Sequence, residues 1–153
     1  DYYYGPFITK QLYTQYAQFT GSLRPLQEQL RDKMNVEKER PVGIMQALGL
    51  VNIYTQDFEE AYTVYNELID NYKQQDSHTL FIAAIAATGA SHPANAIALL
   101  ELARRKNPEH KGSRYALGLL YLQTKNNEGA VISFKNVSDV DFQSQFFNFR
   151  ITK

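Results

Sequence analysis

LGLVNIYTQDFEEAYTVY at residues 48–65 is matched by AAIAATGASHPANAIALL at 83–100 and by LGLLYLQTKNNEGAVISF at 117–134. In each segment a small residue is followed by an alanine and then, four positions later, by a large apolar residue. The three sets are Gly49, Ala84 and Gly118; Ala61, Ala96 and Ala130; and Tyr65, Leu100 and Phe134. The spacing is 35 residues from Ala61 to Ala96 and 34 from Ala96 to Ala130. A fixed period of this length is typical of stacked-repeat proteins.

Hydrophobic periodicity and turn residues predict helices in three pairs. The expected ranges are 43–54 with 58–72, 77–88 with 94–106, and 113–125 with 128–137. Asp57 and Ser91 are the expected N-caps of the second helices in the first two pairs. The small residues should let the two helices of a pair approach closely, and the large residues should fill the gap to the next pair. No segment alternates with period two, so we expect no β-sheet.

The residues before the repeats predict a helical hairpin, residues 1–41, packed on the array. Gly21 is expected to end its first helix as a left-handed cap, and Ser22 to begin the second, with Pro25 in the first turn. At the other end the sequence is rich in phenylalanine, with Phe142, Phe146, Phe147 and Phe149. Residues 145–153 are expected to form a cap over the open end of the stack or a tail.

The composition excludes several classes of protein. The 16 basic and 16 acidic residues give zero net charge, which argues against nucleic-acid binding because that normally needs a basic excess. No apolar run is long enough to span a bilayer, so we expect no membrane insertion by this sequence. The chain begins with Asp1 and not with methionine, which we interpret as a fragment or processed form. The compartment stays open between cytoplasm and periplasm, with an upstream tether as one option.

These residues resemble the tetratricopeptide repeat family, whose 34-residue repeat is a helix–turn–helix. The third repeat matches best, with Leu117-Gly118, Tyr121, Ala130 and Phe134 where the family has Leu-Gly, Tyr, Ala and an aromatic residue. In the first repeat Asn52 replaces the usual tyrosine. The resemblance implies an all-α, right-handed α-solenoid, with repeats at 42–76, 77–110 and 111–144 inside a region of 42–144.

No arrangement of residues suggests catalysis, a cofactor or a metal. His78, His92 and His110 are scattered along the sequence, and we expect His92 and His110 at the surface because they lie in a turn and after a helix end. A metal site needs several ligands at set spacings, and a nucleophile needs a neighbouring base. The sequence therefore predicts a protein that is not an enzyme.

In the family, the first helices of successive pairs line a concave groove. The resemblance places these residues in that groove: Gln46, Leu50, Ile53, Tyr54, His78, Phe81, Ile85, Thr88, Tyr115, Leu119, Leu122 and Gln123. The predicted groove is therefore mainly apolar and aromatic. Contiguous apolar surface usually marks a binding site. The positions that carry a carboxylate clamp in one family variant hold Gln46, Leu50, Ile82, Gly112 and Ala116, so that clamp is absent.

The first functional hypothesis is a protein-interaction or scaffold module that binds an apolar peptide or helix of a partner in the groove. The expected binding residues are Gln46, Leu50, Tyr54, Phe81, Ile85, Tyr115, Leu119 and Leu122. The alternative is a self-assembling structural dimer. The layout also resembles bacterial secretion chaperones. Two further interpretations stay open: the chain's own N-terminal helix or Phe-rich tail fills the groove, or Leu50, Ile85 and Leu119 belong to the core.

Overall fold

The computed structural model describes residues 10–36 and 42–142, and every regular element in these ranges is a helix. The helices are α1 (Lys10–Val36), α2 (Val42–Tyr54), α3 (Phe58–Asp70), α4 (Ser77–Gly89), α5 (Pro93–Lys106), α6 (Lys111–Gln123) and α7 (Asn127–Phe134). The predicted all-α class is confirmed, and each helix from α2 to α7 lies within a few residues of its expected range.

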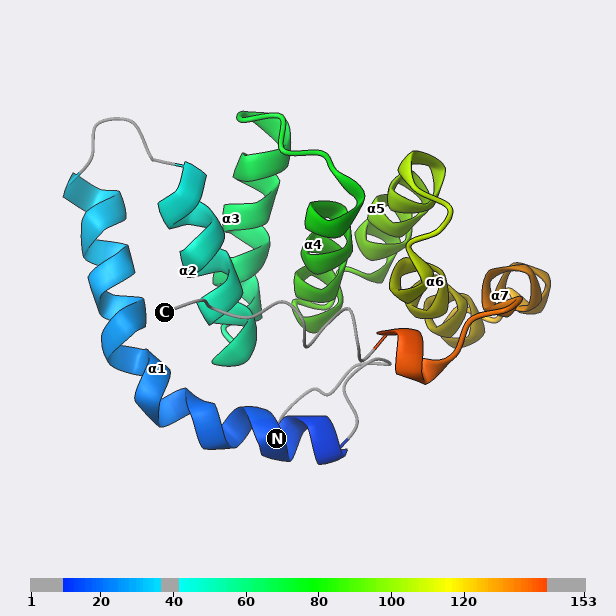
Figure 1. The fold of residues 1–153 in the computed structure, drawn as a ribbon, viewed down its shortest axis with the longest axis horizontal. Coiled ribbons are helices and arrows are strands. Elements are labelled where there is room, and N and C mark those ends of the chain that lie inside the picture. Colours follow the sequence, from blue (N-terminus) through cyan, green and yellow to red (C-terminus); the bar gives the residue numbers. More distant parts are fainter. Residues whose placement is uncertain (1–9, 37–41, 143–153) are drawn as a thin grey trace.

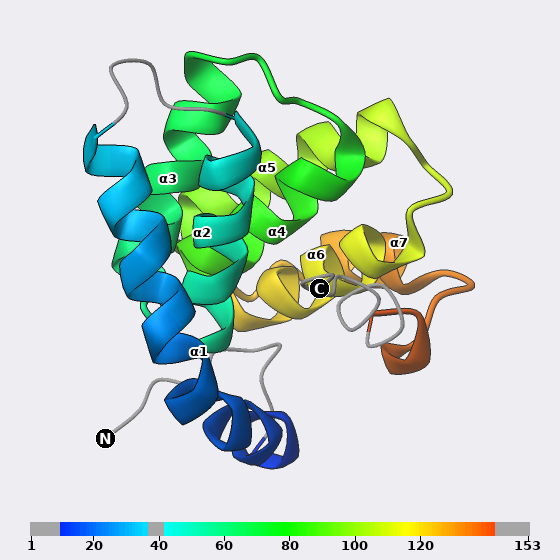
Figure 2. The same ribbon diagram turned by 60° about the vertical axis from the view of Figure 1, so that its left-hand side comes forward.

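The helices stack in chain order (Figure 1). Within a pair, α2 packs on α3, α4 on α5 and α6 on α7, and each pair contacts the next through α3 and α4 or through α5 and α6. The first helix α4 also contacts the first helices α2 and α6 on either side of it, so the three form one side of the array. We call this the first-helix side. Figure 2, a view turned by 60°, shows the same succession. The predicted α-solenoid is therefore confirmed.

The spacing of small and large residues that recurs along this chain is explained by packing. A Cβ atom added to Gly49 would lie 2.8 Å from the ring of Tyr65, and one added to Gly118 would lie 2.5 Å from the ring of Phe134. Carbon atoms normally approach no closer than about 3.5 Å. The glycines thus let α2 meet α3 and α6 meet α7, as predicted. The predicted role of Tyr65 and Phe134 needs correction, because both rings lie on the glycine of their own pair.

The turn inside each pair also repeats. Gln56, Ser91 and Lys125 have φ angles of 65°, 67° and 64°, and all three stand at the same repeat position. The residue that follows each of them donates its backbone N–H to the carbonyl five residues earlier, at the end of the helix. These bonds run from Asp57 to Asn52, from His92 to Ala87, and from Asn126 to Tyr121. This is the Schellman pattern, which usually has glycine at the left-handed position. The prediction of Ser91 as an N-cap is wrong, since Ser91 is that left-handed residue and His92 precedes α5.

The predicted N-terminal hairpin is wrong. A single helix, α1, runs through Gly21 and Pro25. Pro25 has no N–H, so it cannot bond to the carbonyl of Gly21, and a proline inside a helix usually bends it. Figure 1 shows the two halves of α1 pointing in different directions. The sequence signals for a break at this point thus produced a bend, because the rest of the segment favours a helix on both sides.

A polar seam joins α1 to the first pair. Gln27 is 0% exposed, and its amide donates to Asn52 Oδ1 at 2.6 Å and to Asp57 Oδ2 at 2.7 Å. Arg24 donates to Asp57 at 2.6 Å. Burial would raise the pKa of Asp57, but hydrogen bonds from Thr55, Gln27 and Arg24 outweigh it and lower that pKa. Asp57 stands at the N-cap of α3 as predicted, yet its carboxylate makes no cap bond and serves this seam instead.

Beyond α7 the chain makes a short helical turn at residues 139–142, drawn in orange in Figure 1. Ser138 opens this turn, and its N–H donates to Asp141 Oδ2 at 2.8 Å. The predicted cap or tail at 145–153, and the first nine residues of the chain, lie outside the described residues.

Candidate functional site

The residues expected in the groove fall into two groups. Leu50, Ile53, Phe81, Ile85 and Thr88 are buried in the helix array. A second group remains wholly or partly accessible: Gln46, Tyr54, His78, Tyr115, Leu119, Leu122 and Gln123. The open interpretation that Leu50, Ile85 and Leu119 belong to the core therefore holds for Leu50 and Ile85, whereas Leu119 remains partly accessible. The accessible members lie mainly on α6, at the C-terminal end of the first-helix side.

An aromatic cluster brings together residues that are far apart in the sequence. We define the aromatic socket as His78 and Phe81 of α4, His110 at the N-cap of α6, and Tyr115 of α6. The ring centroid of Phe81 lies 5.9 Å from that of His78 and 5.0 Å from that of His110. Such spacings are typical of attractive aromatic pairs.

One ring enters this socket from outside the helix pairs. Phe142 meets Phe81 edge-on at a centroid distance of 5.5 Å, and lies 6.2 Å from Tyr115. Phe142 is only 2% exposed. The open interpretation that the Phe-rich tail fills the groove is therefore supported at Phe142, while the later phenylalanines lie outside the described residues.

The two histidines of the socket are paired. His110 Nδ1 accepts the amide N–H of Ser113 at 3.2 Å, which caps α6. In the neutral ring the proton must then lie on Nε2, and this atom is 3.4 Å from Nδ1 of His78. Protonation of His110 would place a proton on Nδ1 as well, and the cap would be lost. The expectation that His110 lies at the surface is wrong, since His110 is 6% exposed and its ring lies beside that of His78.

Burial keeps this pair neutral. It lowers the pKa of His110 to about 4, with a smaller contribution from the neighbouring His78 ring. Burial also lowers the pKa of His78, while the carboxylate of Asp76 acts in the opposite direction. Burial raises the pKa of Tyr115, and Asp139 contributes to the rise. At neutral pH the socket is therefore an uncharged, largely aromatic surface.

The third histidine is apart from the socket. His92 stacks on Tyr62 at 4.6 Å and lies 3.6 Å from Glu59. Among residues 10–36 and 42–142, no group of three or more His, Asp or Glu side chains is arranged to hold a metal ion. Within the same ranges no helix is long and apolar enough to cross a membrane.

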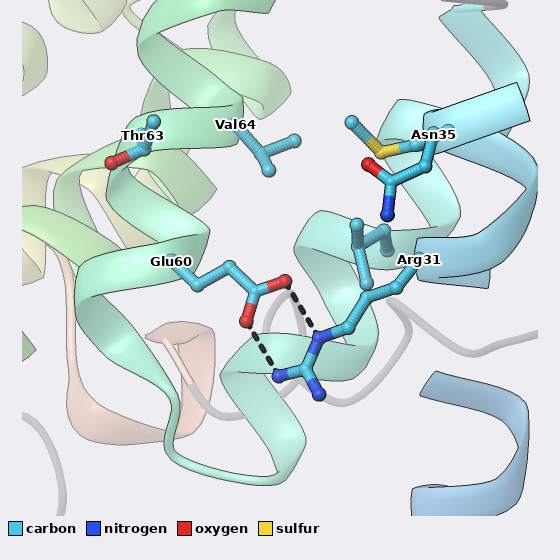
Figure 3. Close-up of a pocket in the computed structure, with 7 residues that line it drawn as sticks. Arg31, Asn35, Glu60, Thr63 and Val64 are labelled. Atoms are coloured by element: carbon cyan, nitrogen blue, oxygen red, sulfur yellow. Dashed lines mark hydrogen bonds and ion pairs between the residues drawn. The ribbon is translucent and has the colours of Figure 1, made fainter. Parts of the chain in front are cut away.

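A pocket of about 280 Å³ lies between α1, α2 and α3 (Figure 3). Arg31 points across it and makes two hydrogen bonds to the carboxylate of Glu60, at 2.6 and 3.0 Å. Arg31 also contacts Glu28 at 2.5 Å. Its charge is thus already matched by two carboxylates, and the pocket is better explained as part of the junction with α1 than as an anion site.

Sequence reasoning identified His78, Phe81 and Tyr115 but missed Phe142 and His110 as their neighbours. The repeat pattern assigns positions within helices, whereas His110 precedes α6 and Phe142 follows the last repeat helix. The signal that could have found Phe142 was the concentration of phenylalanine that begins there.

Comparison with known proteins supports the fold alone. No family model matches the sequence, and no curated protein sequence matches it. The structure is similar to a solved structure described as MamA MSR-1 C2, with a TM-score of 0.68 and 17% sequence identity. The match covers 91% of this chain and 75% of that chain. At this level of identity the likeness supports the stacked helical fold, and the assignment to the tetratricopeptide repeat family stays a resemblance.

Proposed function

We propose that this chain is a non-enzymatic protein-interaction module that binds an apolar segment of a partner on its first-helix side. The observation that carries the proposal is the aromatic socket with Phe142 inserted. This aromatic ring comes from outside the helix pairs, and residues of two successive pairs, Phe81 and Tyr115, hold it.

The accessible surface beside the socket has the same character. Tyr115, Leu119 and Leu122 follow one another on α6, with Leu122 exposed and the other two partly buried. Tyrosine and other aromatic residues are enriched where proteins meet, because they offer a large contact area at little entropic cost. Compared with the expected binding residues, this proposal moves the contacts from the buried Leu50 and Ile85 to the surface of α6.

The test is a panning experiment with a displayed library of random peptides. The target is the Phe142→Ala chain, in which the socket has lost its occupant ring. We expect enrichment of peptides with aromatic residues. Their affinity should fall at least tenfold when Tyr115→Asp is added, while Val131→Asp on the exposed face of α7 should leave it unchanged.

Circular dichroism must show equal helix content in all three chains for this comparison to hold. The proposal is rejected if no peptide is enriched, or if the enriched peptides bind the Tyr115→Asp chain equally well.

Self-association is a second candidate function, and one observation favours it. Val131 and Ile132 of α7 are 72% and 69% exposed, at the end of the helix stack. Adjacent exposed aliphatic side chains are a common feature of contact surfaces. Light scattering over a concentration series tests this candidate: the mass should rise with concentration, and Val131→Lys with Ile132→Lys should abolish the rise. A constant monomer mass would exclude it.

A further inference from the structure

A stripe of exposed side chains runs along α7, the second helix of the last pair in the stack (Figure 1). Its four exposed members are Glu128, Val131, Ile132 and Lys135. Positions three, four and seven residues after the first lie on one side of an α-helix, and Lys135 continues the series at the C-cap. The buried residues Ala130 and Ser133 lie on the opposite side.

The equivalent positions in the preceding pair are covered. Ile97 of α5 stands 34 residues before Val131 and is partly buried. Glu101 of α5 stands 34 residues before Lys135 and accepts a hydrogen bond from the hydroxyl of Tyr121, which belongs to the following helix α6. The stripe on α7 therefore includes positions at which the next helix packs elsewhere in the stack, and here Val131 is 72% exposed.

We propose, on the basis of the self-association considered above, that this stripe packs against α7 of a second copy, antiparallel to it, across a two-fold axis that passes between Val131 and Ile132. The stripe is complementary to itself in this arrangement, as a two-fold contact requires. Glu128 stands three residues before Val131, and Lys135 stands three residues after Ile132. Reversal of one copy thus brings Glu128 of each chain opposite Lys135 of the other.

The charges of the stripe favour the antiparallel direction. A parallel pair would place Glu128 beside Glu128 and Lys135 beside Lys135, and facing like charges oppose association. Arg114 donates to the carbonyl of Lys135, so a second positive group lies at the same end of α7. Antiparallel packing brings this positive end against the Glu128 end of the other copy.

The dimer should be weak, because each copy contributes one short helix of eight residues. Contacts that bury less than about 1,200 Å² in total belong to transient complexes. We therefore expect a dissociation constant between about 10 µM and 1 mM.

Sedimentation equilibrium over this concentration range tests the pairing. Glu128→Lys alone, or Lys135→Glu alone, should raise the dissociation constant about tenfold, because two attractive pairs become repulsive. The double exchange, Glu128→Lys with Lys135→Glu, should restore the original value. Asp32→Lys is the matched control, since Asp32 is an exposed acidic residue on α1, at the other end of the stack, and it should leave the dissociation constant unchanged.

The pairing and the self-association can fail separately. A constant monomer mass at all concentrations would exclude both. If the mass rises but the single exchanges leave the dissociation constant unchanged, or if the double exchange does not restore it, the antiparallel pairing is overturned and self-association stands. Circular dichroism of each variant must show the helix content of the unsubstituted chain.

Discussion

The close contact between Gly49 and Tyr65 gives the most direct test of the packing. We compare Gly49→Ala with Gly43→Ala, since both residues lie in α2. A Cβ at position 49 would meet the Tyr65 ring at 2.8, 3.1 and 3.3 Å, whereas nothing lies within 4 Å of a Cβ at position 43. Tyr65 is buried, so its ring has little room to move.

The two substitutions should therefore change stability in opposite directions. Alanine in place of glycine favours a helix by about 0.8–1 kcal/mol. Overpacking of a core costs about 1–3 kcal/mol. Gly43→Ala should raise the free energy of unfolding by up to about 1 kcal/mol, and Gly49→Ala should lower it by about 1–2 kcal/mol. For a chain of this size each kcal/mol corresponds to about 2–4 °C in Tm.

Urea unfolding followed by circular dichroism measures both changes. In a Tyr65→Leu background, Gly49→Ala should cost less by about 1 kcal/mol, because the ring that causes the clash is gone. If Gly49→Ala is as stable as the unsubstituted chain, or if the cost is the same without the ring, the packing argument is refuted.

Four further predictions follow from single features, each measured by urea unfolding. Tyr65→Phe should raise the free energy of unfolding by about 1 kcal/mol, because the Tyr65 hydroxyl is buried without a partner; a loss of stability would contradict this. Lys125→Gly should stabilise by about 0.5–1 kcal/mol, since Lys125 has a φ of 64° that glycine adopts freely, and Lys125→Val should destabilise. Gln27→Ala should lower the free energy of unfolding by about 2–3 kcal/mol, because the side-chain oxygens of Asn52 and Asp57 would each lose a hydrogen-bond donor. Gln29 is exposed, so Gln29→Ala should leave the free energy of unfolding unchanged. The pKa of His110 lies near 4 when folded, below its ordinary 6.5, so the unfolded chain takes up the proton first as the pH falls. The free energy of unfolding should be highest above about pH 6.5 and fall by about 2–3 kcal/mol as the pH is lowered to 4. In His110→Asn this dependence of the free energy of unfolding on pH should be weaker.

The sequence predicted the structure well at positions where only one residue type fits the packing. Gly49 and Gly118 could be assigned because a missing side chain at a fixed period indicates a close helix crossing. The bounds of α2 to α7 could be predicted for the same reason, since turn residues recur with the helices. Local signals were misleading in the N-terminal segment. Gly21 and Pro25 suggested a break, whereas the structure continues the helix through both residues.

The candidate site was only partly predictable. Phe81 and Ile85 were placed on the correct helix, but their burial depends on neighbours that lie far away in the sequence. The pairing of His78 with His110 depends on how the start of α6 lies against the start of α4, which no spacing within one helix records. Asn52 looked like a departure from the repeat pattern, and its cause became visible only when Gln27 was found against it.

That contact between Gln27 and Asn52 distinguishes the first repeat from the two that follow it. Helix α1 packs on α2 as α3 packs on α4 and as α5 packs on α6, so it takes the place of the second helix of an earlier pair. Suppose that residues 42–142 were duplicated in tandem to make a longer protein. Only the first unit would meet Gln27, and in the following unit the amide of Asn52 would face the apolar flank of α7. Extension of the protein would thus require an apolar residue at this position in every added unit.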